Sequence, residues 1–404
     1  MTPQSTASLH PRFIDSIAAV DPATWDALVG SDYPFLRHAF LLALESTGCS
    51  NTRSGWQPSH LLLEDASGAV LGCLPLYLKD NSYGEYVFDW SWADAWRRHG
   101  LQYYPKLLSA VPFTPCAGPR LCLAASVVPA VAMGVVLAAV QARAGQTGAS
   151  GWHLLFPQTR DMGWLQQEPL LLRTGCQYQW FNRDYADFDA FLATLNSRKR
   201  KNLRKERARV AESGIRFVRL RGNELTPELW ETFYGFYANT YLVRGRAPYL
   251  NRAFFLEIGR SMPDALLLVL ALKGDVPVAG ALCFLGRDTL YGRYWGCSDE
   301  HQFLHFETCY YQGIEYCIEQ GLARFDSGAQ GEHKIQRGFE PVPTWSLHWI
   351  EHPRFRDAIA HFLQEETTHV SHYLQAAAEY LPFRKDLQLD TNDPAPEPGQ
   401  VASG

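Results

Sequence analysis

The order of predicted secondary-structure elements repeats once along this chain, and the repeat leaves few folds open. Each copy reads as a hairpin, a strand, a helix and a further strand, with polar turns at 65–68 and 273–275 inside the hairpins. The copies lie roughly 200 residues apart, which is too long for a solenoid and typical of two related domains. We therefore predict an α/β (α+β) fold with mixed central sheets flanked by helices. The elements are 59–63, 69–78, 84–95, 107–113, 125–144 and 152–156, then 266–272, 276–285, 289–297, 305–320 and 323–326.

Length and composition also favour two globular domains. The chain has 404 residues, of which 47% are hydrophobic and 20% charged, and one domain takes about 150 residues. We place an N-terminal domain at 1–178 and a C-terminal domain at 179–385, with the crossing between them in 175–185. The segment 386–404 is polar, acidic and rich in proline, which predicts a disordered tail.

Charge and cysteine content favour a cytoplasmic protein. The net charge is -5, so binding to nucleic acid or to an anionic membrane would have to come from local patches. The nine cysteines include no Cys-x-x-Cys pair, which favours free thiols. The N-terminus lacks the pattern of a secretion signal, and the uncharged run 121–140 is rich in alanine and valine. We expect a buried core helix there and no stable membrane insertion.

The loop Gly328–Lys334 is the first candidate for a binding site. Three of its first four residues are glycine or alanine. An acid, an imidazole and an amine then follow in succession, Glu332, His333 and Lys334. Ordering a loop so rich in glycine is costly unless a ligand binds there.

Three segments carry a resemblance to a known family: 111–120, the basic segment 197–207, and 325–339 with its Gly338-Phe339 pair. Together with the repeated element order, they resemble the Fem-like family of predicted N-acyltransferases, whose chains hold two domains of the Gcn5-related N-acetyltransferase (GNAT) fold. The resemblance implies two tandem GNAT-like domains. It also implies acyl transfer to the amine of a small molecule, a peptide or a cell-wall precursor.

The resemblance leaves two donors open. Typical GNAT enzymes bind coenzyme A through a glycine-rich loop, but the matching loop 298–306 has no glycine, and 114–120 has one glycine and a lone Arg120. This departure favours aminoacyl-tRNA, as in Fem ligases, with acyl-coenzyme A as the alternative co-substrate and no tightly bound cofactor. The remaining alternative is a non-catalytic module that recognises a cell-wall precursor or peptide.

Phosphate contacts are predicted from two groups of cations. The helix expected at about 187–212 carries eight cations between 198 and 209, and like charges so close favour an anionic partner over a merely solvated face. The segment 328–339 adds two more cations, Lys334 and Arg337. The resemblance places Lys334 where Fem ligases have a lysine before a Gly-Phe pair. The predicted donor-binding residues are Arg200, Lys201, Arg204, Lys205, Lys334 and Arg337.

Catalytic roles are assigned to three residues. Glu332 or His333 would take the proton of the attacking ammonium, with Asp326 orienting one of them, and the sequence does not choose between the two. Tyr294 lies on the strand where GNAT enzymes bulge to expose a backbone N–H, and its hydroxyl would protonate the leaving group. The competing interpretation is structural hydrogen bonding in the loop and a core tyrosine on the strand.

The cluster 89–96 is the predicted acceptor site. Read as a strand, it places Trp90 and Trp92 on one face, and Asp94 could hold a cationic amine. An equally good interpretation is that these aromatic side chains pack between the two domains. We predict no metal site, since His301 and His305 at i, i+4 lack a third ligand.

Overall fold

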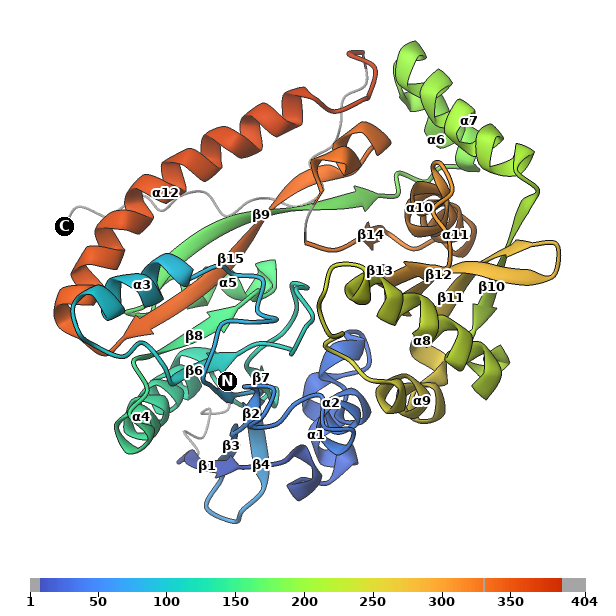
Figure 1. Cartoon of the computed structure of the whole chain (residues 1–404). Coiled ribbons are helices and arrows are strands. Elements are labelled where there is room, and N and C mark those ends of the chain that lie inside the picture. Colours follow the sequence, from blue (N-terminus) through green and yellow to red (C-terminus); the bar gives the residue numbers. More distant parts are fainter. Residues whose placement is uncertain (1–7, 330, 387–404) are drawn as a thin grey trace.

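The computed structural model describes residues 8–329 and 331–386, so the predicted tail from 387 onward lies outside the described residues. Eleven strands form one mixed sheet in the order β10-β11-β12-β13-β14-β9-β15-β8-β6-β5-β2, and four more form a small sheet, β1-β3-β4-β7. Figure 1 shows this large sheet running across the whole molecule.

The first half of the chain, residues 8–181, begins with two helices and the small sheet. Its long helix α4 starts with Pro129 at the first turn and ends where Gly148 takes a left-handed conformation. Among the described residues, no helix is long and apolar enough to cross a membrane. The elements are β1 (His10–Ile14), α1 (Pro22–Val29), α2 (His38–Ser46), β2 (Gln57–Pro58), β3 (His60–Glu64), β4 (Val70–Leu74), β5 (Tyr77–Lys79), α3 (Trp90–Arg98), β6 (Lys106–Ser109), β7 (Cys122–Leu123), α4 (Pro129–Thr147), β8 (Gly151–Leu155), α5 (Thr159–Leu165) and β9 (Leu171–Phe181).

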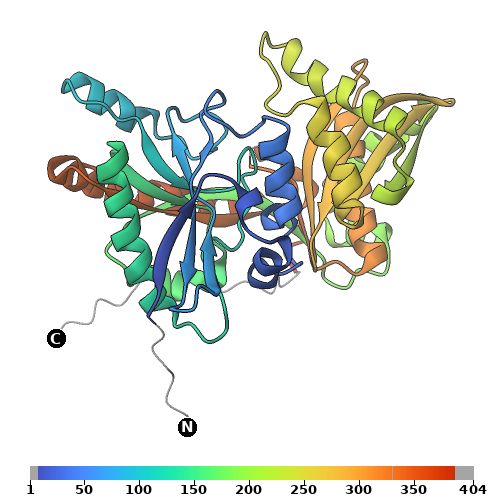
Figure 2. The ribbon, with the colours of Figure 1, turned by 90° about the horizontal axis from the view of Figure 1, so that it is seen from below.

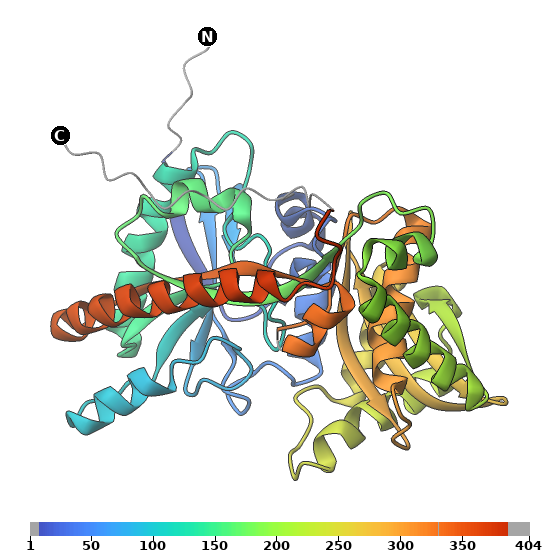
Figure 3. The same ribbon diagram turned by 90° about the horizontal axis from the view of Figure 1, so that it is seen from above.

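The second half, residues 182–386, builds a larger layered unit. Helix α8 packs against β12 and β13, α11 packs against β13 and β14, and α7 packs against β10. Figure 3 shows these helices around the strands of the second half. The elements are α6 (Phe188–Thr194), α7 (Ser197–Glu212), β10 (Ile215–Arg221), α8 (Pro227–Leu242), α9 (Arg252–Ser261), β11 (Leu266–Lys273), β12 (Val276–Leu285), β13 (Thr289–Cys297), α10 (Leu304–Phe306), a π-helical turn η5 (Glu307–Tyr311), α11 (Gln312–Gln320), β14 (Arg324–Asp326), a 3₁₀ helix η6 (Glu332–Arg337), β15 (Glu340–Ile350) and α12 (Pro353–Glu379).

The two halves exchange strands at the centre of the sheet. Strand β9 of the first half pairs with β14 of the second, and β15 of the second half pairs with β8 of the first. The two exchanged strands pair with each other along nine residues, from Leu171–Gln179 against Glu340–His348. The segment 175–185, which we expected to be a crossing, is therefore largely strand.

One apolar core also joins the halves. Phe35, in the turn before α2, packs against Phe284 of β12 at 4.9 Å and Tyr291 of β13 at 5.2 Å between ring centroids. All three side chains are at least nine-tenths buried. Figure 2 shows the two halves side by side with α1 and α2 of the first half lying toward the second.

Two sequence predictions about secondary structure are wrong. The predicted strand over 84–95 is instead a loop followed by helix α3, because Trp92 and Trp96 share one helical face and pack against the second half, where Trp96 stacks on Phe355 at 3.7 Å. The single helix predicted at about 187–212 is two helices, because α6 ends at Thr194 and a new helix starts after Asn196. The Asn196 side chain accepts a hydrogen bond from Lys199 N–H and so caps α7.

Candidate active site

The candidate site lies where strands β13 and β14 separate. These parallel strands pair only at Thr289–Tyr291 and Arg324–Asp326, and β13 continues to Cys297 paired with β12 alone. Just past the separation, β13 has a bulge against β12: Leu282 faces Tyr294 and Cys283 faces Gly292, so Arg293 has no partner. A bulge leaves one residue outside the ladder and redirects its side chain.

An ion pair closes the point of separation. Arg293 Nη2 lies 3.0 Å from Asp326 Oδ2, and both side chains are 2% exposed. Burial by itself would lower the pKa of Arg293, but the Asp326 carboxylate outweighs it and raises that pKa. Asp326 Oδ1 accepts the Gly328 N–H at 3.0 Å, so the carboxylate also holds the start of the loop.

Lys334 enters the same centre from η6. Its side chain is buried, and Nζ donates to the carbonyls of Ser327 at 3.1 Å and Gly328 at 2.7 Å. Burial lowers the pKa of Lys334 to about 8, against the opposing pull of Asp326. Gly331 and Gly338, which bound η6, have φ angles of 120° and 84°, values that side-chain-bearing residues rarely adopt. The turn can therefore direct Lys334 inward.

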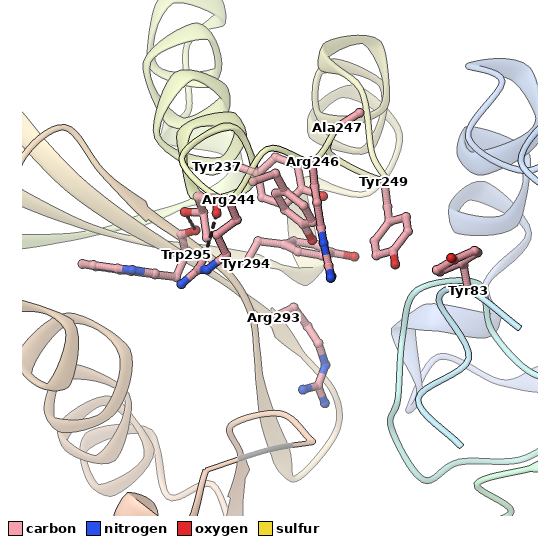
Figure 4. Close-up of a pocket in the computed structure, with 11 residues that line it drawn as sticks. Tyr83, Tyr237, Arg244, Arg246, Ala247, Tyr249, Arg293, Tyr294 and Trp295 are labelled. Carbon is pink, nitrogen blue, oxygen red and sulfur yellow. Dashed lines mark hydrogen bonds between the residues drawn. The ribbon is translucent and has the colours of Figure 1, made fainter. Parts of the chain in front are cut away.

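A cavity of about 630 Å³ lies above this centre, between α8, the turn after it and the loop before α3. Figure 4 shows its aromatic rings gathered over Arg293, whose side chain points away from them. The lining residues include three arginines and no acid. Tyr294 Oη is buried there without a hydrogen-bond partner among the described residues. The lining is Tyr83, Tyr237, Thr240, Tyr241, Arg244, Arg246, Ala247, Tyr249, Arg293, Tyr294 and Trp295.

The first half completes the site through the segment 111–120. Phe113 stacks on Tyr249 of the cavity wall, with ring centroids 4.9 Å apart. Cys116 is buried near Arg293; burial raises the pKa of its thiol, and Arg293 opposes that rise. Arg120 holds the segment by donating to the carbonyls of Leu155, Pro119 and Cys116 at 2.7–2.8 Å. This arginine is therefore engaged inside the protein.

The two predicted base residues lie at the start of η6, and both are exposed. Glu332 accepts a hydrogen bond from Tyr373 of α12 at 2.8 Å. His333 bonds through Nε2 to Tyr310 Oη at 2.9 Å, and its ring lies 6.3 Å from that of His305, which in turn lies 5.2 Å from the ring of Trp295 in the cavity wall. Partial burial, with Arg337 and Lys334 nearby, lowers the pKa of His333. This shift favours the neutral imidazole.

The predicted phosphate-binding residues divide into two groups. Arg337 and Arg204 are engaged with acids: Arg337 pairs with Glu206 at 2.9 Å and Arg204 with Asp189 at 2.8 Å. Among the described residues, Arg200, Lys201 and Lys205 have no acidic partner. Helix α7 contacts η6 through Arg337 and Glu206, so these three cations lie on a helix packed beside the Lys334 turn.

The predicted acceptor residues lie on α3 and do not share one pocket. Trp92 is buried against His348, with ring centroids 4.9 Å apart, and Asp94 is on the surface, paired with Arg97. Trp90 is exposed and contacts Tyr83 of the cavity wall, with ring centroids 5.2 Å apart. Of the three, only Trp90 is adjacent to the cavity.

Sequence reasoning missed most of the cavity wall. Arg293 had a detectable signal, since it is a lone cation inside the otherwise uncharged strand Thr289–Cys297. The missed tyrosines and arginines come from α8, the turn after it and the loop before α3. Nothing in their local pattern separates them from surface residues. Among the described residues, no group of His, Cys, Asp and Glu is arranged to hold a metal ion.

The structure is a mixed α/β protein with helices flanking mixed sheets, as predicted. Residues 16–385 match the family described as FemAB-like, peptidoglycan biosynthesis/recognition, and the chain belongs to this family. Membership of this family indicates a transferase of the acyltransferase type. No curated protein sequence matches the chain.

Solved structures share the fold at low sequence identity. The C-terminal domain of a putative lysylphosphatidylglycerol synthetase from Agrobacterium fabrum has a TM-score of 0.52 at 10% identity, covering 87% of this chain and 97% of that one. FemX gives 0.49 at 14% identity, covering 84% and 98%. A tandem GNAT protein from the clavulanic acid biosynthesis pathway gives 0.45 at 9% identity, covering 86% and 99%. The first of these likenesses supports the fold alone.

Proposed function

We propose that this protein transfers an acyl group from an activated donor to an amine, with the reaction centred on Arg293, Asp326 and Lys334. The observation that carries the proposal is their convergence: three buried ionisable groups meet at a strand bulge, and one of them, Arg293, lines a cavity large enough for a substrate. Buried charges are costly, and a fold retains them where they act on a ligand or stabilise one another.

The proposed reaction is direct attack. The acceptor amine loses a proton to a base and forms a C–N bond to the donor carbonyl, and the C–O or C–S bond then breaks. The Arg293 and Lys334 cations and a free N–H at the bulge stabilise the negative oxygen of the intermediate. Tyr294, whose buried hydroxyl has no hydrogen-bond partner among the described residues, gives its proton to the leaving oxygen or sulfur. Burial raises the pKa of this hydroxyl, so it keeps the proton until negative charge develops on the leaving atom. The base is His333 or Glu332, and the neutral imidazole favours His333.

The proposed donor is aminoacyl-tRNA. Helix α7, which packs beside the Lys334 turn, carries three cations without an acidic partner among the described residues: Arg200, Lys201 and Lys205. These charges could bind the phosphates of a polyanion that extends beyond the cavity. Acyl-coenzyme A is the alternative donor.

The proposed acceptor is an amine that also carries anionic groups. The cavity wall has three arginines and no acid, so an amine without negative charge would be repelled. A peptidoglycan precursor fits both this charge and the family description. Trp90, beside Tyr83, would extend the acceptor wall, and we retain no acceptor role for Trp92 or Asp94.

Ligand-induced stabilisation tests the donor. A ligand that binds only the folded protein at 100 times its dissociation constant adds about 2.7 kcal/mol to the free energy of unfolding. We expect charged tRNA to stabilise the protein at low salt, and the Lys201→Ala/Lys205→Ala variant to lose this effect while Lys273→Ala/Lys385→Ala keeps it. If acyl-coenzyme A alone stabilised the protein, it would be the donor in place of aminoacyl-tRNA, and the proposed acyl transfer would stand. An absence of stabilisation by either donor would contradict the proposed function.

A further inference from the structure

Exposed apolar side chains lie on two segments that border the cavity, the loop that contains Tyr83 and the end of α8 before Arg244. Tyr83, Phe88 and Trp90, which we call the aromatic lip, are 59%, 55% and 40% exposed. Leu242 and Val243, the aliphatic lip at the end of α8, are 62% and 70% exposed. Large exposed apolar groups in one area mark a contact surface rather than ordinary solvent exposure.

Both lips belong to the same face. Tyr83 lines the cavity together with Arg244 and Arg246, which directly follow the aliphatic lip. Figure 3 shows the segment around α3 and the turn after α8 projecting on one side of the molecule, and Figure 2 shows the same from another direction. The cavity wall therefore includes Tyr83 of the aromatic lip and the turn that directly follows the aliphatic lip.

The aromatic lip is held in place by buried groups. The Tyr83 carbonyl accepts hydrogen bonds from Trp56 Nε1 at 3.1 Å and from Lys79 Nζ at 3.2 Å. The Phe88 carbonyl accepts one from Arg173 Nη1 at 2.9 Å. With its backbone fixed inside, the loop presents its rings to solvent in a defined arrangement.

Exposed arginines outnumber the unpaired acids near the lips, where Asp80 is the exposed acid nearest to Tyr83 in the sequence. Arg244 and Arg246 lie in the exposed turn 242–247, and Arg98 is exposed on α3. Within the described part of the chain, none of these three arginines pairs with an acid; Arg244 and Arg98 donate only to carbonyls of their own helices. Aromatic rings, aliphatic side chains and arginines together match the interface of an anionic bilayer, where rings sit at the headgroup level and cations meet lipid phosphates.

We propose that the two lips rest on an anionic lipid surface and hold the cavity mouth at its headgroup layer. A protein partner would need matching acids as well as an apolar surface, whereas an anionic bilayer supplies both at once. This contact goes beyond the proposed acyl transfer and does not depend on it, because it is a property of the rim and not of Arg293, Asp326 or Lys334.

Vesicle flotation without any substrate tests the contact. We expect the protein to float with phosphatidylglycerol vesicles, to bind phosphatidylcholine vesicles more weakly, and to lose binding as salt rises. The Phe88→Ser/Leu242→Ser/Val243→Ser variant should bind at least about tenfold more weakly, since it removes three groups that the bilayer would bury. The variant Val131→Ser/Val276→Ser/Tyr380→Ser, changed at exposed apolar positions elsewhere, should bind like the wild type.

A second readout locates the contact. Lipids brominated along their chains should quench part of the tryptophan fluorescence, and Trp90→Phe should remove that part. Failure to float with phosphatidylglycerol would overturn the proposal, as would equal binding by the two triple variants. Self-association that the first triple variant abolishes would also overturn it, by making a second copy of the chain the occupant of this face.

Discussion

Arg293 of β13 and Asp326 of β14 form an ion pair across the point where these two strands part, with 3.0 Å between Nη2 and Oδ2. The pair closes the sheet where its backbone ladder ends, and Asp326 also anchors the loop that leads to Lys334. A single contact therefore links the sheet to the proposed catalytic turn.

Breaking this pair should cost stability as well as activity. Asp326→Leu leaves Arg293 buried without its counter-charge, and we expect the free energy of unfolding to fall by about 3–5 kcal/mol in urea titrations. The double variant Arg293→Met/Asp326→Leu should recover most of that loss but no turnover. Recovery of turnover in the double variant would show that the pair is only structural.

Lys334→Met should separate chemistry from folding. The methionine fills the same space without a charge, so stability at pH 7 should stay equal or rise. Turnover should fall by about 10²–10³, the usual effect of removing one group that stabilises a developing oxyanion. Circular dichroism and steady-state kinetics on one preparation check both parts, and unchanged turnover would remove Lys334 from the mechanism.

The same variant gives a pH prediction. The folded protein releases the Lys334 proton near pH 8, whereas the unfolded chain keeps it up to about pH 10.5. Between these values the unfolded state binds more protons, so the wild type gains stability with rising pH relative to Lys334→Met, by up to about 3 kcal/mol. Unfolding titrations of both proteins at pH 7.5 and 10 measure this difference, and parallel curves would contradict the lowered pKa.

His333 and Glu332 can be told apart by their pH profiles. If His333 is the base, His333→Gln should lower kcat by about 10²–10³ and remove the fall in kcat/KM at acid pH. Burial and the nearby cations place that fall below the ordinary histidine pKa of 6.5. Glu332→Gln should keep the profile. The reverse pattern would assign the role to Glu332.

Lys106 holds together a buried cluster of the first half. Its ammonium binds the carboxylates of Glu85 and Asp89, and all three side chains are almost completely buried. Lys106→Met leaves Asp89 without its cation and Glu85 with only the more distant Lys79, at 3.9 Å, and we expect a loss of about 3–5 kcal/mol. Arg97→Met, which removes an exposed partner of Asp94 on α3, is the control and should change stability by less than about 1 kcal/mol. Equal effects would mean that the cluster is not stabilised by its charges.

Sequence pattern predicted the second half well because its signals are local. The apolar runs on either side of 273–275 form the β11–β12 hairpin, and the predicted strand 289–297 coincides with β13. An ordered turn around Lys334 was also within reach, since Gly331 and Gly338 permit the backbone that turns this side chain inward.

Tertiary contacts decided the rest. The cluster 89–96 alternates in a way that favours a strand, but burial of Trp92 and Trp96 against α12 and β15 makes it a helix. Arg293 was overlooked because its burial depends on Asp326 and on Cys116 from the other half of the chain. No local pattern reveals which distant strand β9 or β15 will join.

The exchange of β9 and β15 also bears on how such a protein can be built or recombined. Each half lends a central strand to the other, so a chain cut between residues 178 and 179 would end inside β9 and leave both fragments with an open sheet edge. Chimaeras that trade one half for that of a relative would have to match the nine-residue pairing between the lent strands. Inheritance of the two halves as a unit follows from their interlocked hydrogen bonding, whatever chemistry either half performs.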